Sequence, residues 1–144
     1  MLSETLDKVR SHWVSENLVL ASPLDRDDLY ERFLTLGVSA TPEILEVFSK
    51  LNGFAEDDMD SECLSFWTVD KIVRENQMGW VRDRLYVHFA DFLIDSHTYA
   101  FKINDSGSSS VYCHWDSSYV VKICESFETF FEYYLFDTPK LWPS

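Results

Sequence analysis

The sequence predicts an α+β fold, with an antiparallel sheet of about four to six strands and helices packed on one side of it. Three observations support this fold class. The first third of the chain has apolar residues at helical spacing, residues 85–123 hold β-branched and aromatic runs between short polar turns, and the last segment returns to helical spacing with many aromatic residues. A length of 144 residues is typical of one domain, so we expect a single domain over residues 1–144.

Two amphipathic helices are expected at the start of the chain. The first carries an apolar stripe at Leu2, Leu6, Val9 and Trp13, and the second at Leu29, Phe33 and Leu36. We expect the first helix to run from Ser3, as its cap, to Leu18. Gly37 is expected to end the second helix, because glycine adopts the left-handed conformation that closes many helices.

Thr41 and Pro42 indicate the start of a third helix, because threonine caps helix N-termini and proline suits the first turn. This helix is expected to end before Gly53. The next segment, residues 56–62, has five acidic side chains in seven positions and is predicted to be an exposed loop. A short strand over residues 64–67 follows, and then a helical segment that Thr68 caps.

The main strands are expected at residues 85–94, 98–103, 111–115 and 119–123. The short polar separations favour an antiparallel meander, with a turn at residues 104–110 and a tight hairpin at 116–118. The terminal helix is predicted by the helical spacing of Phe127, Phe130, Phe131, Tyr134 and Leu135. We expect its aromatic stripe to dock on the sheet as part of the core.

Composition and charge exclude several classes of function. Hydrophobic residues make up 46% of the chain, which is enough for a core and excludes general disorder. No apolar run approaches the roughly 18 residues that cross a bilayer, and three cysteines without a leader-like N-terminus predict a cytoplasmic setting. The net charge of −13 repels phosphate backbones and anionic lipids, so neither direct nucleic-acid binding nor membrane binding is expected. The same charge attracts a basic protein or only keeps the chain soluble, and composition does not separate these two readings.

No motif for cofactor, metal or catalytic chemistry is evident. The four glycines, at positions 37, 53, 79 and 107, cannot form a nucleotide-binding loop. The residues that we considered for a metal or acid–base site are His88, Asp91, Asp95, His97, Cys113, His114 and Asp116, but they have no recognised ligand spacing. Cys113 and His114 are adjacent in a predicted strand and should point to opposite faces. We therefore expect no cofactor, no metal and no enzymatic activity.

Three aromatic residues are candidates for a protein interface. Phe54, Trp80 and Trp142 lie beside predicted breaks or near the C-terminus, where burial is less assured. Tryptophan is also a frequent anchor of protein interfaces.

A series of motifs between Leu29 and Leu135 resembles a known family. The motifs are Leu29, Phe33, Gly37, Pro42, Leu45, Phe48 and Asn52-Gly53-Phe54, then Phe66-Trp67, Phe89-Ala90-Asp91, residues 99–103, residues 111–115 and Ser126-Phe127. In this order they resemble the SUKH superfamily, which groups yeast cell-wall-assembly regulators with many bacterial immunity proteins. Members commonly carry a Gly-Asp pair between two strands, where this chain has F-L-I-D-S at residues 92–96.

The resemblance implies an α+β fold without catalytic residues and a protein-binding function, commonly the neutralisation of a toxin that is often a nuclease. An acidic face would be attracted to the basic cleft of a nuclease. We therefore predict an immunity protein, with a regulatory adaptor as the main alternative and an unrecognised enzyme as the third. The predicted contact residues are Glu56, Asp57, Asp58, Asp60, Glu62, Asp91, Asp95, Asp116, Phe54, Trp80 and Trp142. For residues 56–62 the alternative is a solvated loop that has no partner.

Overall fold

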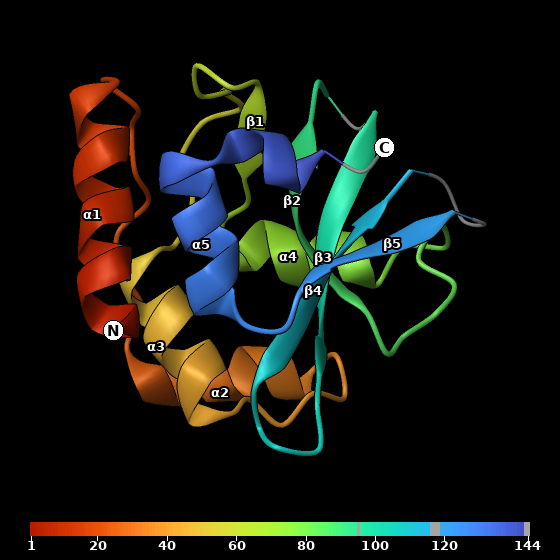
Figure 1. Ribbon diagram of the computed structural model, residues 1–144. Coiled ribbons are helices and arrows are strands. Elements are labelled where there is room, and N and C mark those ends of the chain that lie inside the picture. Colours follow the sequence, from red (N-terminus) through yellow and green to blue (C-terminus); the bar gives the residue numbers. More distant parts are fainter. Residues whose placement is uncertain (95, 116–118, 143–144) are drawn as a thin grey trace.

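The computed structural model describes residues 1–94, 96–115 and 119–142. Within these residues the chain forms five α-helices, a short 3₁₀ helix and one five-stranded antiparallel sheet (Figure 1). The strands follow one another in the order β1 (Leu64–Phe66), β2 (Val87–Phe92), β3 (His97–Ile103), β4 (Ser109–His114) and β5 (Val120–Cys124). The helices are α1 (Leu2–Ser15), α2 (Arg26–Leu34), α3 (Pro42–Lys50), α4 (Val69–Asn76) and α5 (Phe127–Phe136), followed by η1 (Thr138–Leu141). The predicted α+β class and antiparallel meander are confirmed.

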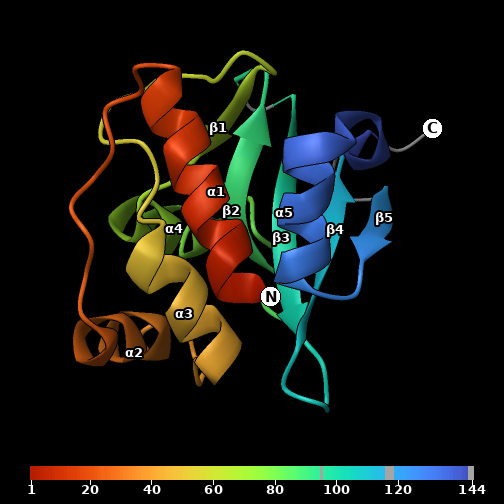
Figure 2. The ribbon, with the colours of Figure 1, turned by 60° about the vertical axis from the view of Figure 1, so that its left-hand side comes forward.

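One face of the sheet is covered by α1, α3 and α5, as Figure 2 shows. The core between these layers is largely aromatic. Phe127 and Phe130 of α5 are fully buried, and both contact Phe89 of β2 with ring centroids 5.5 Å apart. The expected docking of the terminal helix on the sheet is therefore confirmed. None of the described helices is both long and apolar enough to span a membrane.

Most helix starts follow from their capping residues. The side chains that accept a hydrogen bond from the first turn of a helix belong to Asp25, Thr41, Thr68 and Ser126. The prediction of Ser3 as a cap is wrong, because α1 begins at Leu2, with Met1 in the cap position. Ser3 instead accepts a hydrogen bond from Lys50 Nζ at 2.8 Å, which ties α1 to the end of α3.

The Asn52-Gly53 pair has a structural role after α3. Asn52 Oδ1 accepts a hydrogen bond from the backbone N–H of Val69, and its Nδ2 donates to the Ser22 carbonyl, both at 2.8 Å. Gly53 has a φ of 73°, and a Cβ there would lie 2.3 Å from the Trp67 carbonyl oxygen. Only glycine fits this close approach of two backbone segments.

The strand predicted at residues 85–94 is shorter in the structure. It spans Val87–Phe92, and the next two residues, Leu93 and Ile94, form part of the turn with φ values of 48° and 53°. Tight antiparallel hairpins favour residues in the left-handed conformation at the turn. Here those residues are Leu93 and Ile94, which belong to an apolar run that the sequence pattern assigns to a strand. The tight hairpin predicted at 116–118 lies outside the described residues.

The edge of the sheet at β2 is completed by a side chain of α4. Strand β1 pairs only with the second half of β2, opposite residues 90–92. Beside the first half, the side chain of Asn76 accepts a hydrogen bond from the His88 backbone N–H and donates one to the His88 carbonyl, both at 2.8 Å. This places α4 and the segment after it at the margin of the sheet face that α1, α3 and α5 leave open.

Candidate functional site

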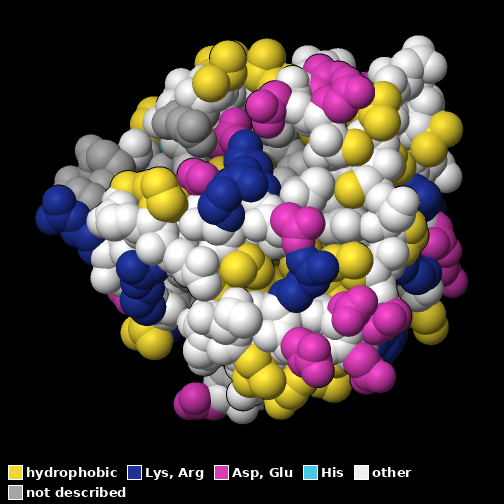
Figure 3. All heavy atoms as spheres, turned by 180° about the vertical axis from the view of Figure 1, so that it is seen from behind, with side chains coloured by type: hydrophobic (Ala, Val, Ile, Leu, Met, Phe, Trp, Pro, Cys, Tyr) yellow, Lys and Arg dark blue, Asp and Glu magenta, His cyan; other side chains and the backbone are white. Residues whose placement is uncertain are grey.

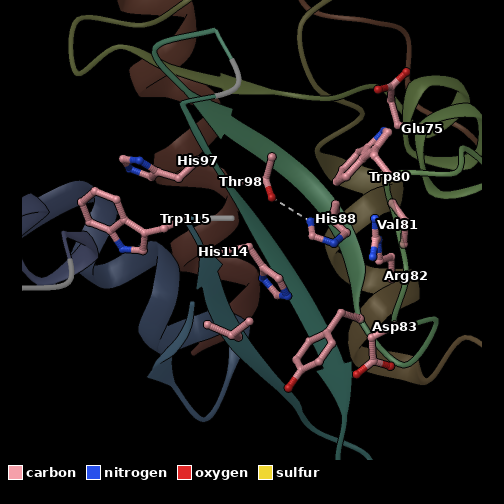
Figure 4. A pocket seen from close by; sticks show the side chains of 12 residues that line it. Glu75, Trp80, Val81, Arg82, Asp83, His88, His97, Thr98, His114 and Trp115 are labelled. Carbon is pink, nitrogen blue, oxygen red and sulfur yellow. Dashed lines mark hydrogen bonds between the residues drawn. The ribbon is translucent and has the colours of Figure 1, made fainter. Parts of the chain in front are cut away.

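A cavity of about 710 Å³ lies on the open face of the sheet (Figure 4). From the strands and their ends it is lined by His88, His97, Thr98, His114, Trp115 and Val120. From α4 and the segment that follows it, the lining residues are Glu75, Trp80, Val81, Arg82, Asp83 and Tyr86. The cavity therefore combines a floor of sheet residues with a wall built from residues 75–86.

Three neighbouring strands bring the polar groups of the floor together. Thr98 and His114 face each other as a cross-strand pair of β3 and β4, and His88 pairs with Ala100 beside them on β2. His88 Nδ1 lies 2.8 Å from Thr98 Oγ1, at hydrogen-bond distance. The imidazole rings of His88 and His114 meet edge to face, with centroids 4.6 Å apart.

A shift in the register of β2 and β3 after His88 allows His88 to line the cavity while the next residue of β2 packs in the core. His88 pairs with Ala100 whereas Ala90 pairs with Tyr99, so Phe89 is the extra residue of a β-bulge. Phe89 packs in the aromatic core while His88 lines the cavity on the other face.

Aromatic rings extend the floor into the wall. The ring of Trp80 contacts that of His88, and the ring of Tyr86 contacts that of His114, each pair with centroids 4.8 Å apart. Trp80, His88, His114 and Tyr86 thus form a continuous row of rings across the cavity. Trp80 and Trp115 each remain 43% exposed, so they present aromatic surface to a bound molecule.

The two floor histidines are neutral at pH 7. Burial lowers the pKa of His88 to about 3, and the neighbouring His114 adds to this effect. Burial also lowers the pKa of His114, against the opposing influence of the Asp83 carboxylate. His114 Nδ1 is buried and has no hydrogen-bond partner among the described residues. A buried polar atom of this kind is unusual in a folded protein.

The acidic run at residues 56–62 does not form one uniform face. Glu56, Asp57, Asp58 and Glu62 are exposed as predicted. Asp60 is only 6% exposed, because its carboxylate accepts hydrogen bonds from the backbone N–H groups of residues 62 and 64 and from the Tyr134 hydroxyl. Asp60 therefore organises the loop and is not available to a partner.

Two other predicted contact residues also have internal roles. Asp91 is 4% exposed and accepts a hydrogen bond from Trp67 Nε1 at 2.6 Å. Phe54 is equally buried, and its ring packs against Trp13 and Phe66 in the core. The position of Phe54 next to a predicted helix break gave no sign of its burial. The Phe54 backbone N–H bonds to the Phe66 carbonyl of β1, and Trp13 of α1 covers its ring.

The remaining predicted contact residues differ in their placement. Trp80 reaches the cavity, whereas Trp142 is half-buried with its ring 4.6 Å from that of Phe92. Asp95 and Asp116 lie outside the described residues.

The residues that we considered for metal or acid–base chemistry are partly brought together. His88, His97 and His114 all line the cavity, and Cys113 points into the core on the opposite face from His114, as expected. Among the described residues, no group of three or more His, Cys, Asp or Glu side chains is placed to hold a metal ion. Sequence reasoning did not join these histidines to Trp80 and Tyr86. The available signal was the alternation of polar residues along three adjacent strands, but their register could not be known.

The comparisons with known proteins leave the family open. No protein-family model matches the chain, and no curated protein matches it. The SUKH resemblance therefore stays a prediction.

Proposed function

We propose that the chain is a protein-binding domain that receives its partner at the cavity on the open face of the sheet. The observation that carries this proposal is the row of aromatic rings, with Trp80 exposed at one end, in a cavity that the exposed Trp115 also lines. Tryptophan and tyrosine at a concave site are typical anchors of protein interfaces, because they bury a large area at a small entropic cost.

The partner is a basic protein in this proposal. At pH 7 the chain carries a net charge of −13, which accelerates encounter with a positively charged surface. Acidic side chains also gather over α2 in the lower right of Figure 3, which views the molecule from behind Figure 1. The exposed acids of residues 56–62 belong to another surface, since Ser61 in that run bonds to Glu16 near the end of α1. We assign to those acids long-range attraction and no direct contact.

Within this class, an immunity protein that neutralises a toxin, often a nuclease, is the specific function that we favour. The SUKH resemblance and the acidic charge support it independently of each other. A regulatory adaptor that binds a cellular partner is the alternative. An immunity gene should lie beside a gene for a large secreted toxin, so the genomic neighbourhood distinguishes the two.

The geometry supports binding better than catalysis. His88 and Thr98 have the spacing of a base and a hydroxyl nucleophile, but an imidazole with a pKa of about 3 is a weak base at neutral pH. The cysteine of β4, Cys113, faces the core, and burial raises the pKa of its thiol to about 12. Neither group is activated for nucleophilic chemistry.

Affinity capture from the native host tests the proposal. The bait would be the wild-type chain and a Trp80→Ala/Trp115→Ala variant, with Phe136→Ala as the control, since Phe136 is 73% exposed on α5 away from the cavity. We expect a stoichiometric basic partner to be retained by the wild type and the control and lost by the double variant, with the same result for purified components. A partner that binds all three equally would place the interface elsewhere.

Charge neutralisation tests the part assigned to residues 56–62. Replacing Glu56, Asp57, Asp58 and Glu62 with their amides should slow association and weaken its salt dependence, with little change in the dissociation rate. A large increase in the dissociation rate would show that this loop is a direct contact surface.

A further inference from the structure

We propose that the cavity on the open face is a receptor for a single cationic side chain, the guanidinium group of an arginine presented by the basic partner. The inference deepens the proposed function and rests on it for the identity of the partner. The preference of the cavity itself does not depend on that partner and can be measured with a small probe.

The walls of the cavity suit a flat cation. The rings of Trp80, His88, His114 and Tyr86 form the continuous row described above, and Trp115 also contributes to the lining of the cavity. Figure 4 shows Trp80 beside His88, whereas the ring of Trp115 lies next to His97. A guanidinium plane is weakly hydrated and stacks on aromatic faces, whereas an ammonium group loses more hydration on entering such a site.

The charges at the cavity also favour a cation. Glu75 and Asp83 line it, and Asp83 is close enough to raise the pKa of His114 against the effect of burial. Among the lining residues that the structure describes, Arg82 is the one cation, and it is exposed. Within the described part of the chain, neither Asp83 nor Arg82 forms an ion pair. Glu75 is already paired with Arg74, with Nε and Oε2 3.9 Å apart. Asp83 and the chain's net charge of −13 are therefore what favour a cation at the site.

The floor of the cavity adds no positive charge. His88 and His114 are neutral at pH 7, so they do not repel a cation. An arginine guanidinium in the cavity would therefore meet aromatic ring faces, and the Asp83 carboxylate would balance its charge.

The test is a titration followed by NMR, with signals of the Trp80 indole and the His114 ring as reporters. The probes are N-acetyl-L-arginine amide, its uncharged isostere N-acetyl-L-citrulline amide, and N-acetyl-L-glutamate amide. We expect saturable binding of the arginine probe at the two reporters. The citrulline probe should bind about threefold to tenfold more weakly, and the glutamate probe should show no saturable binding.

Three variants separate a built site from general attraction to an acidic protein. Asp83→Asn should weaken binding of the arginine probe by about threefold to tenfold, while Asp57→Asn removes the same charge from an exposed position outside the cavity and should have little effect. Arg82→Gln should leave binding unchanged or tighten it.

Several results would overturn the inference. These are equal binding of the citrulline probe, preference for the glutamate probe, signal changes spread over the acidic surface, or no binding of any probe. If no probe binds, the capture experiment with the Trp80 and Trp115 variant still tests protein binding. Failure of that capture leaves the preference of the cavity for arginine measurable.

Discussion

The neutral imidazole of His88 makes the stability of the fold depend on pH. In the unfolded chain this histidine has its ordinary pKa of 6.5, whereas burial and the neighbouring His114 lower its pKa in the folded state to about 3. As the pH falls below 6.5, the unfolded state binds a proton that the folded state does not bind. The contribution to stability is therefore complete above pH 6.5 and is progressively lost as the pH falls towards 3.

The size of this effect follows from the two pKa values. Between pH 7 and pH 5, the free energy of unfolding should fall by about 2 kcal/mol because of His88 alone. His114 and His97 act in the same direction, because burial lowers the pKa of each. Burial raises the pKa of Asp60 and Glu43, which opposes the effect. A variant of His88 is therefore needed to isolate its share.

The assay is urea unfolding at pH 7, 6 and 5, followed by tryptophan fluorescence. In a His88→Asn variant, the loss of unfolding free energy between pH 7 and pH 5 should be smaller than in the wild type by about 2 kcal/mol. Val14→Asn, at an exposed position on α1 that does not titrate, is the control and should show the pH dependence of the wild type. Parallel losses in the wild type and the His88 variant, within about 0.5 kcal/mol, would refute the coupling of His88 to stability.

Three further substitutions test contacts that hold the fold together. Tyr134→Phe should lower the free energy of unfolding by about 1–3 kcal/mol, because the buried carboxylate of Asp60 loses a hydrogen bond; unchanged urea unfolding would mean that water replaces the hydroxyl. Gly53→Ala should cost about 3 kcal/mol or more, because of its positive φ and the contact with the Trp67 carbonyl, and a normal melting temperature would contradict this. Asn76→Ala should cost about 2 kcal/mol and speed amide hydrogen exchange in the first half of β2, and unaltered exchange there would show that the side chain does not hold that edge.

Local signals in the sequence predicted most of the fold. Thr41 and Thr68 cap helices as predicted, and the capping bonds involve residues only three positions apart. Ser3 failed as a cap because its hydroxyl accepts from Lys50, a partner that no local pattern reveals. The strand predicted at residues 85–94 was too long for a similar reason. Leu93 and Ile94 form part of the turn, and an apolar run gives no sign of where a strand reverses.

The candidate site was harder to predict because it depends on contacts between distant segments. The histidines were visible in the sequence, but the pairing of Thr98 with His114 and the bulge at Phe89 decide which side chains share a face. The wall needs the Asn76 contacts that hold α4 beside His88. The acidic run illustrates the same limit, because the burial of Asp60 depends on a hydroxyl from the last helix of the chain.

The side-chain amide of Asn76 also has a consequence for self-association. An exposed strand edge is a template on which the backbone of another molecule can add as a new strand, the first step of many protein aggregates. At the uncovered half of β2, Asn76 already occupies both backbone groups of His88 as an added strand would. One amide thereby opposes the addition of a foreign strand at this stretch of the sheet edge.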